Sequence, residues 1–295
     1  MYIIQGKQGE IGMWKYLPIP ILFFGLMGFN YLMTIVMNLD VAEFMEQQIS
    51  QKGKTRFFAE NMAFFVLLLA GLFFWVRFIH KQSLRSLTTS RPKIDWGRVF
   101  FTFFMLSTFI IVSTLISFYS SPEDYIFNFQ PIPFLILAGI AILLVPIQTS
   151  FEEYFFRGYL MQGLGLACKN RWVPLFTTSI LFGVMHIANP EVEKIGMILL
   201  LYYIGTGLFL GIITLMDEGL ELALGFHAAN NLITVLLVTA DWTALQTDSI
   251  FIDTSEPSAG FEILLPLLII FPVFLLILSK KYKWTNWSKK LFGKL

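Results

Sequence analysis

The sequence has few charged residues for its length. Lys, Arg, Asp and Glu make up 14% of the 295 residues, whereas a soluble domain carries about 25%. Hydrophobic residues make up 56% of the chain, and the mean hydropathy is +0.68. So few charges do not cover a water-facing surface. The composition therefore excludes an ordinary soluble protein and indicates an all-α polytopic membrane protein.

Cysteine and a strong net charge are also missing. The single cysteine, Cys168, excludes an intrachain disulfide and a zinc site built from cysteines. The net charge of +1 gives no global indication of a nucleic-acid partner, so we expect none. The partners that this composition predicts are the lipid bilayer and whatever the protein binds within it.

Apolar stretches near the length of a membrane span recur along the chain. About 20 apolar residues cross the hydrocarbon core, and about eight stretches meet or approach this length. The first is longer than the apolar part of a signal peptide and has no cleavage motif, so we interpret it as a retained span. The predicted spans are 16–38, 58–79, 98–119, 132–151, 174–189, 195–216, 220–240 and 259–279.

The basic residues predict the orientation of these spans. Lys and Arg are frequent between spans two and three and in the C-terminal tail, and they are absent from 120–131 and 241–258. Because basic connections stay in the cytoplasm, both termini are predicted to be cytoplasmic, in the plasma membrane of a prokaryote. The external segment "DVAEFMEQQISQKGKTRFF" is basic near its end and is predicted to form an amphipathic interfacial helix.

The stretch "FEEYFFRGYL", residues 151–160, puts charges where the chain is otherwise apolar. Glu153 and Arg157 are four residues apart, so on a helix they share a face and form an ion pair. Glu152 points elsewhere and is left without a local partner. Such a carboxylate suits a general base, although a helix-end ion pair beside an interfacial Glu explains the motif equally well.

Two of the three histidines also fall inside predicted spans. His186 follows Phe182 by one helical turn in "LFGVMHIANP". His227 and Asn231 share a face in "ALGFHAANNLI", where buried polar groups need hydrogen-bond partners. The alternatives are a satisfied core histidine at 186 and an interhelical clamp at 227 and 231. With the predicted topology, these groups and the acid pair meet in a cavity that opens to the cytoplasm.

Two further features are interpreted structurally. Asp217, Glu218 and Glu221 lie at a short connection, which predicts a solvated turn before a helix. Gly207 and Gly211 form a G-x-x-x-G pair, which predicts a close helix contact.

Three motifs in order resemble one family. "EEYFFR" fits E-E-x-x-x-R, "FGVMH" fits F-x-x-x-H, and "HAANN" fits H-x-x-x-N. Together they resemble the CPBP family of intramembrane proteases, which includes CAAX-prenyl-protease-like, abortive-infection and bacteriocin-processing proteins. The resemblance covers residues 132–240, predicted as the catalytic core. Residues 1–131 are predicted as three N-terminal spans, and 241–295 as the last span with a basic tail.

The resemblance implies an enzyme that hydrolyses peptide bonds within the membrane. Glu152 and His186 would activate water, and His227 and Asn231 would stabilise the oxyanion. Glu153 belongs to the motif and is either catalytic or only paired with Arg157. The substrate would be a membrane-associated polypeptide or peptide, with prenylated CAAX-type proteins as one class.

The resemblance leaves the role of a metal open. Family names often include metalloprotease, and Glu152, His186 and His227 would make the ligand set of a catalytic zinc ion. However, no H-E-x-x-H helix is present, and related members have been interpreted as metal-independent glutamate proteases. We therefore favour a mechanism without an obligatory cofactor and keep zinc as the alternative.

Two other function classes also fit the sequence. Intramembrane acids and histidines occur in proton-coupled transporters, although no inverted repeat is evident here. An inactive immunity or scaffold protein would keep the same fold, although the motifs are intact.

Overall fold

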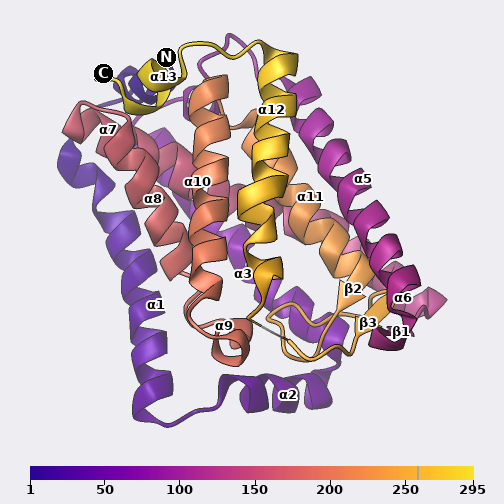
Figure 1. Ribbon diagram of the computed structural model, residues 1–295. Helices are drawn as coiled ribbons and strands as arrows, with labels where there is room; N and C mark the ends of the chain where they lie inside the picture. The colour runs from indigo at the N-terminus through magenta and orange to yellow at the C-terminus, as the bar shows by residue number, and fades with distance from the viewer. Residues whose placement is uncertain (258) are drawn as a thin grey trace.

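Long helices run side by side through most of the computed structural model, which describes residues 1–257 and 259–295 (Figure 1). The helices are α1 (Pro18–Val36), α2 (Val41–Lys52), α3 (Lys54–Phe74), α4 (Leu84–Thr88), α5 (Trp96–Ser120), α6 (Pro131–Glu153), α7 (Met161–Cys168), α8 (Trp172–Val184), α9 (Pro190–Ile195), α10 (Leu199–Asp217), α11 (Glu221–Leu237), α12 (Phe271–Tyr282) and α13 (Trp287–Phe292).

Membrane-spanning helices are confirmed as the main feature of the fold. Among the described residues, five helical segments are long and apolar enough to cross a membrane. They are Met13–Val36, Lys54–Ile79, Trp96–Ser120, Pro131–Cys168 and Leu199–Asp217. The other three predicted spans coincide with shorter helices, α8, α11 and α12, of 13, 17 and 12 residues. The chain is therefore a multi-pass helical membrane protein, and eight crossings stay a prediction.

Two predicted spans end earlier than their apolar sequence does. The helix predicted over 174–189 ends at Val184, and the following residues form turns up to Asn189. Asn189 has extended backbone angles, which is the conformation preferred by a residue before proline. The helix predicted over 220–240 ends at Leu237 because the chain there enters a strand.

A small sheet at one end of the bundle was not predicted. Strand β3 (Phe251–Asp253) pairs antiparallel with β1 (Tyr125–Phe127) and parallel with β2 (Val238–Thr239). The sheet joins the two connections that have no Lys or Arg. The predicted amphipathic segment does form a helix, α2, which lies at this same end, below the bundle (Figure 1).

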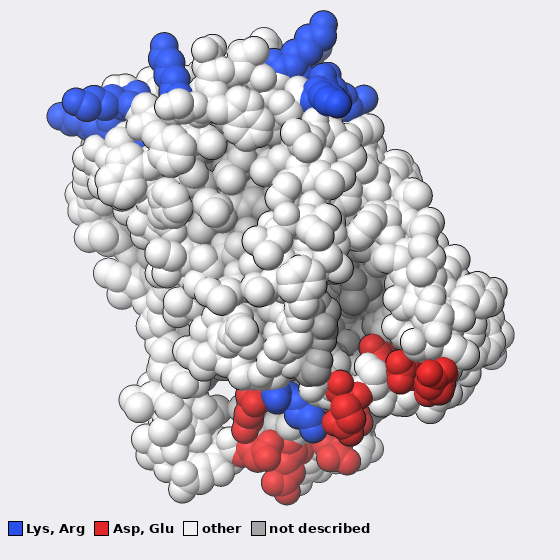
Figure 2. Space-filling model, in the orientation of Figure 1, with Lys and Arg blue, Asp and Glu red and all other residues white. Residues whose placement is uncertain are grey.

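Both termini lie at the opposite end of the bundle (Figure 1). There the backbone N–H of Leu295 donates to the carbonyl of Lys169 at 3.0 Å. In the face that Figure 2 shows, most Lys and Arg lie at the end with the termini, the Asp and Glu lie at the α2 end together with a few basic atoms, and the surface between them is uncharged. This is the arrangement of a membrane protein whose charges lie at the two water-facing ends.

The acidic connection between α10 and α11 is buried, so the prediction of a solvated turn is wrong. Asp217 is 4% exposed and Glu221 is 0% exposed. Arg91 reaches both acids, at 2.8 Å and 3.1 Å, and Arg98 also contacts Asp217. These arginines lie more than 100 residues earlier in the chain, so nothing in the local sequence indicates that the acids have partners.

Helix α6 carries the acid pair and packs against both α3 and α11, while α8 packs against α10. Helices α8 and α10 approach closely because Gly207 has no side chain. A Cβ at Gly207 would lie 2.9 Å from the carbonyl oxygen of Ser179, and one at Gly211 would lie 2.6 Å from a methyl of Leu175. The predicted role of this glycine pair in a close helix contact is confirmed.

Candidate active site

The acid pair lies where α6 changes its winding. Glu152 and Glu153 end the regular α-helix, and the next seven residues, Tyr154–Leu160, form a π-helical segment that leads into α7. The chain thus stays helical past the acid pair. Pro146 also interrupts the backbone hydrogen bonds of α6 just before the pair. Short π-helical segments are frequent at functional sites.

Glu153 is a buried acceptor for two donors. Arg157 Nη1 donates to Glu153 Oε1 at 2.9 Å, which is the pairing that the four-residue spacing predicts. His227 Nδ1 lies 2.7 Å from the same oxygen. Glu153 and Arg157 are both 0% exposed. Glu153 therefore links the motif on α6 to the motif on α11.

Arg157 connects the acid pair to α8 and α10. Its Nη2 donates to the carbonyl oxygen of Gly207 at 3.1 Å, and its guanidinium lies 4.2 Å from the centre of the Phe182 ring. Planar guanidinium groups favour both kinds of contact. The ion pair is thus held in place by two neighbouring helices as well as by its own.

Glu152 has local partners, so the prediction that it lacks one is wrong. Gln148, one turn earlier on α6, donates from Nε2 to Glu152 Oε1. On the other side, His227 Nε2 lies 3.6 Å from Glu152 Oε2. Glu152 is 5% exposed. The carboxylate is therefore oriented by an amide and faces an imidazole across a short gap.

Gln148 is a site residue that the motifs do not include. Its Oε1 accepts a hydrogen bond from Asn231 Nδ2 at 3.0 Å, while its Nε2 serves Glu152. Asn231 Oδ1 in turn accepts from Asn230 Nδ2 at 3.0 Å. Each amide end faces a group of opposite hydrogen-bonding character, so the network is consistent. The signal was its position four residues before Glu152, on the same helix face.

His186 lies in the turn after α8 rather than inside a helix. Its Nδ1 lies 2.7 Å from the carbonyl oxygen of Phe182, and its ring stacks on Tyr203 with centroids 4.1 Å apart. Because a carbonyl only accepts, Nδ1 carries the proton and Nε2 of the neutral ring is left as an acceptor. The Phe182 ring contacts both histidines, with centroids 5.0 Å from His186 and 5.8 Å from His227.

One cavity of about 80 Å³ brings these side chains together. Liquid water occupies about 30 Å³ per molecule, so the cavity suits a few water molecules. Five helices, α6, α8, α10, α11 and α12, and the turn after α8 contribute to its walls. The lining residues are Gln148, Glu152, Phe182, His186, Tyr202, Tyr203, Thr206, Leu210, Phe226, His227, Asn230, Asn231 and Phe271.

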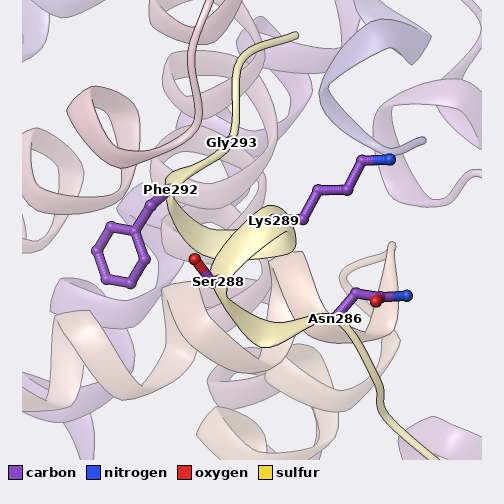
Figure 3. Close-up of a pocket in the computed structure, with 5 residues that line it drawn as sticks. All are labelled: Asn286, Ser288, Lys289, Phe292 and Gly293. Atoms are coloured by element: carbon purple, nitrogen blue, oxygen red, sulfur yellow. The ribbon is translucent and has the colours of Figure 1, made fainter.

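Other candidates for a site lie apart from this cavity. His80, the third histidine, packs its ring against Tyr16 and Tyr159, and burial lowers its pKa. A hollow of about 480 Å³ at α13 is lined by Asn286, Ser288, Lys289, Phe292 and Gly293. In Figure 3 the side chains of Phe292 and Lys289 point to opposite sides of α13, so they do not converge on a ligand.

The three predicted zinc ligands, Glu152, His186 and His227, do not form a metal centre in this arrangement. Among the described residues, no three His, Cys, Asp or Glu side chains are grouped closely enough to hold a metal ion. Both histidines use Nδ1 for protein contacts and leave Nε2, as metal-binding histidines also do, but Phe182 packs against both rings. Glu152, His186 and His227 therefore do not fit a zinc site as they stand.

Together, the fold and the site define a multi-pass helical membrane protein with carboxylates, imidazoles and amides around a buried cavity. A family model described as type II CAAX prenyl endopeptidase Rce1-like matches residues 130–233. An uncharacterised protein of Bacillus subtilis (strain 168), YyaK, is 32% identical over 247 residues, which cover 80% of this chain and 81% of that protein. The chain belongs to the Rce1-like family of CPBP intramembrane proteases. No solved structure matches it significantly.

Proposed function

We propose that this protein is an intramembrane endopeptidase that cleaves membrane-associated polypeptides, including prenylated CAAX-type proteins, with water activated by Glu152 and His186. One observation carries the proposal. Glu152 and His227 face each other at 3.6 Å in a buried cavity that His186 and Asn231 also line. A carboxylate base beside hydrogen-bond donors is what hydrolysis of an amide requires.

In the first step, a water molecule in the cavity attacks the scissile carbonyl carbon. Glu152 takes one proton of that water as the new C–O bond forms, and His186 Nε2 accepts a hydrogen bond from the other. Gln148 keeps the Glu152 carboxylate aimed by donating to Oε1. The attacking water and the base are thus within reach of each other before the substrate arrives.

The negative charge that develops on the carbonyl oxygen is stabilised from α11. An amide nitrogen has two N–H donors. One N–H of Asn231 Nδ2 bonds to Gln148, and the other can donate to the carbonyl oxygen of the substrate. His227 donates to Glu153 through Nδ1, and its ring offers Nε2–H to this oxygen when it takes up a second proton. In the second step the C–N bond breaks, and Glu152 returns its proton to the leaving amine.

In this mechanism Glu153 acts through His227 and does not touch the substrate. Its Oε1 is occupied by Arg157 and by His227 Nδ1, and the carboxylate is fully buried. A carboxylate that holds the far nitrogen of an imidazole fixes the orientation of the ring. We therefore assign Glu153 and Arg157 to the support of His227.

The substrate and the side of entry also belong to the proposal. The charge distribution favours termini in the cytoplasm, so substrate entry from the cytoplasmic leaflet is the expectation. The family description names CAAX prenyl endopeptidases, which makes prenylated C-terminal peptides the first class to assay.

The test is cleavage by purified protein in lipid nanodiscs. Farnesylated peptides ending in a Cys-a-a-X sequence, and the same peptides without the lipid, are incubated with the wild type and with Glu152→Gln, and products are identified by mass spectrometry. We expect new termini only with the wild type, before and after exhaustive chelation. Identical products from both proteins, or none from either, would contradict the proposed function. Loss on chelation that zinc restores would overturn the metal-free mechanism.

A further inference from the structure

A carboxylate outside the three motifs connects the segments that pack around His186. Glu191, in the first turn of α9, accepts hydrogen bonds from three segments. Tyr203 OH donates to Oε1 at 2.7 Å, Asn189 Nδ2 donates to the same oxygen at 2.9 Å, and the backbone N–H of Ala244 donates to Oε2 at 2.9 Å. Both oxygens are thus used, and each partner comes from a different element.

His186 needs such support because no helix fixes it. Helix α8 ends two residues before it, at Val184. Two contacts set the plane of its ring, the hydrogen bond to Phe182 O and the near-parallel stack on Tyr203, with 10° between the ring planes. Because His186 lies in a turn, the orientation of its ring depends on how firmly the residues in contact with it are held. The Tyr203 ring therefore helps to fix the orientation of the His186 imidazole.

The Tyr203 ring is in turn fixed by Glu191. A tyrosine side chain rotates about two bonds, and a hydrogen bond at its hydroxyl removes much of the freedom that ring packing leaves. Here the hydroxyl is bound to a carboxylate that is itself bound to the turn at Asn189 and to the loop at Ala244. That loop follows β2, which continues directly from α11, the helix of His227 and Asn231.

We propose that Glu191 is a positioning residue, which holds His186 toward the catalytic cavity through Tyr203 and ties the His186 turn to the loop after α11. This inference rests on the proposed function for its catalytic consequence, but the placement of the ring is measurable without catalysis. Glu191 touches neither the water nor the substrate, so its loss lowers turnover and leaves substrate binding intact.

Kinetics test the catalytic consequence on a peptide that the wild type cleaves. Glu191→Ala removes all three acceptor contacts and is expected to lower kcat about 10- to 100-fold, the cost of a small misplacement of a catalytic group, with KM unchanged. Glu191→Gln keeps an acceptor for Tyr203 and is expected to restore most of the activity. The matched control is Glu193→Ala, because Glu193 is exposed on the same short helix.

A double-mutant cycle tests the route through Tyr203. Tyr203→Phe keeps the stacking ring and removes its bond to Glu191. If the two residues act in one chain, adding Tyr203→Phe to Glu191→Ala lowers kcat no further. Additive losses in kcat would contradict a route through Tyr203.

The position of the ring is read directly by NMR of the histidine side chains. The chain has only three histidines, so protein labelled with ¹⁵N in the imidazole rings gives three sets of signals. In Glu191→Ala the His186 signals should shift as the Tyr203 ring moves, while those of His80 and His227 stay. Unchanged His186 signals and unchanged kcat would overturn the inference. A wild type that cleaves no peptide would instead refute the proposed function, and the NMR result would still decide the placement.

Discussion

Gln148 shows how one neutral side chain orients both halves of the site. It donates to Glu152 and accepts from Asn231, and these are the base and an oxyanion donor of the proposed mechanism. Gln148→Met keeps the volume and removes both hydrogen bonds. We expect kcat to fall about 10- to 100-fold with little change in KM, measured on any peptide the wild type cleaves. A larger change in KM than in kcat would mean that Gln148 binds the substrate instead.

Arg157 tests whether the buried ion pair is essential to the fold. Arg157→Met leaves Glu153 without its cationic partner in a fully buried site, which is expected to cost about 3–5 kcal/mol. The matched control is Arg56→Met, because Arg56 pairs with Glu60 at the same four-residue spacing on the surface. Thermal unfolding in detergent should shift clearly for Arg157→Met and barely for Arg56→Met. Equal shifts would contradict the role of burial.

At the scale of single residues, spacing within one helix was enough to predict the Glu153–Arg157 pair. It was not enough for residues whose partners come from elsewhere. Asp217 and Glu221 were predicted to be solvated because Arg91 and Arg98 are distant in sequence. The link from Glu153 to His227 spans 74 residues. Helix periodicity carries no information about which faces of two helices pack together. These contacts could therefore be identified only from the three-dimensional structure.

At the scale of elements, the contact between α8 and α10 determines where His186 and Arg157 lie. The contact depends on Gly207, where a side chain would meet the backbone of Ser179. Gly207→Val should push α10 from α8, disturb the carbonyl that accepts from Arg157, and lower both the melting temperature and the activity. Gly139→Val is the control, because a Cβ at Gly139 meets nothing within 4 Å. Similar behaviour of the two variants would contradict the importance of the close contact.

The elements also show where sequence patterns stop being informative. Five long apolar segments were predicted because length and composition alone indicate a span. The strands were missed because each has only two or three residues, too few for an alternating pattern. Helix α8 ends at Val184, before the extended Asn189 that precedes Pro190, and this leaves His186 in a turn, where its ring stacks on Tyr203.

At the scale of the whole molecule, the native cysteine tests the proposed orientation. Cys168 is exposed at the end of the bundle that holds both termini. A membrane-impermeant maleimide should therefore label it in inside-out vesicles and not in intact cells. Ser50→Cys in a Cys168→Ser background places the thiol on α2, at the opposite end, and should give the reverse pattern. Labelling of Cys168 from outside would contradict cytoplasmic termini.

The molecule as a whole is a membrane bundle around a polar cavity with room for a few water molecules, and the proposed function depends on what Glu152 does there. The most direct measurement is kcat/KM of Glu152→Gln beside the wild type, on one peptide and in the same nanodiscs. A general base contributes about 10²- to 10⁴-fold, so we predict a loss of that size with an unchanged melting temperature. Activity within about tenfold of the wild type would contradict Glu152 as the base.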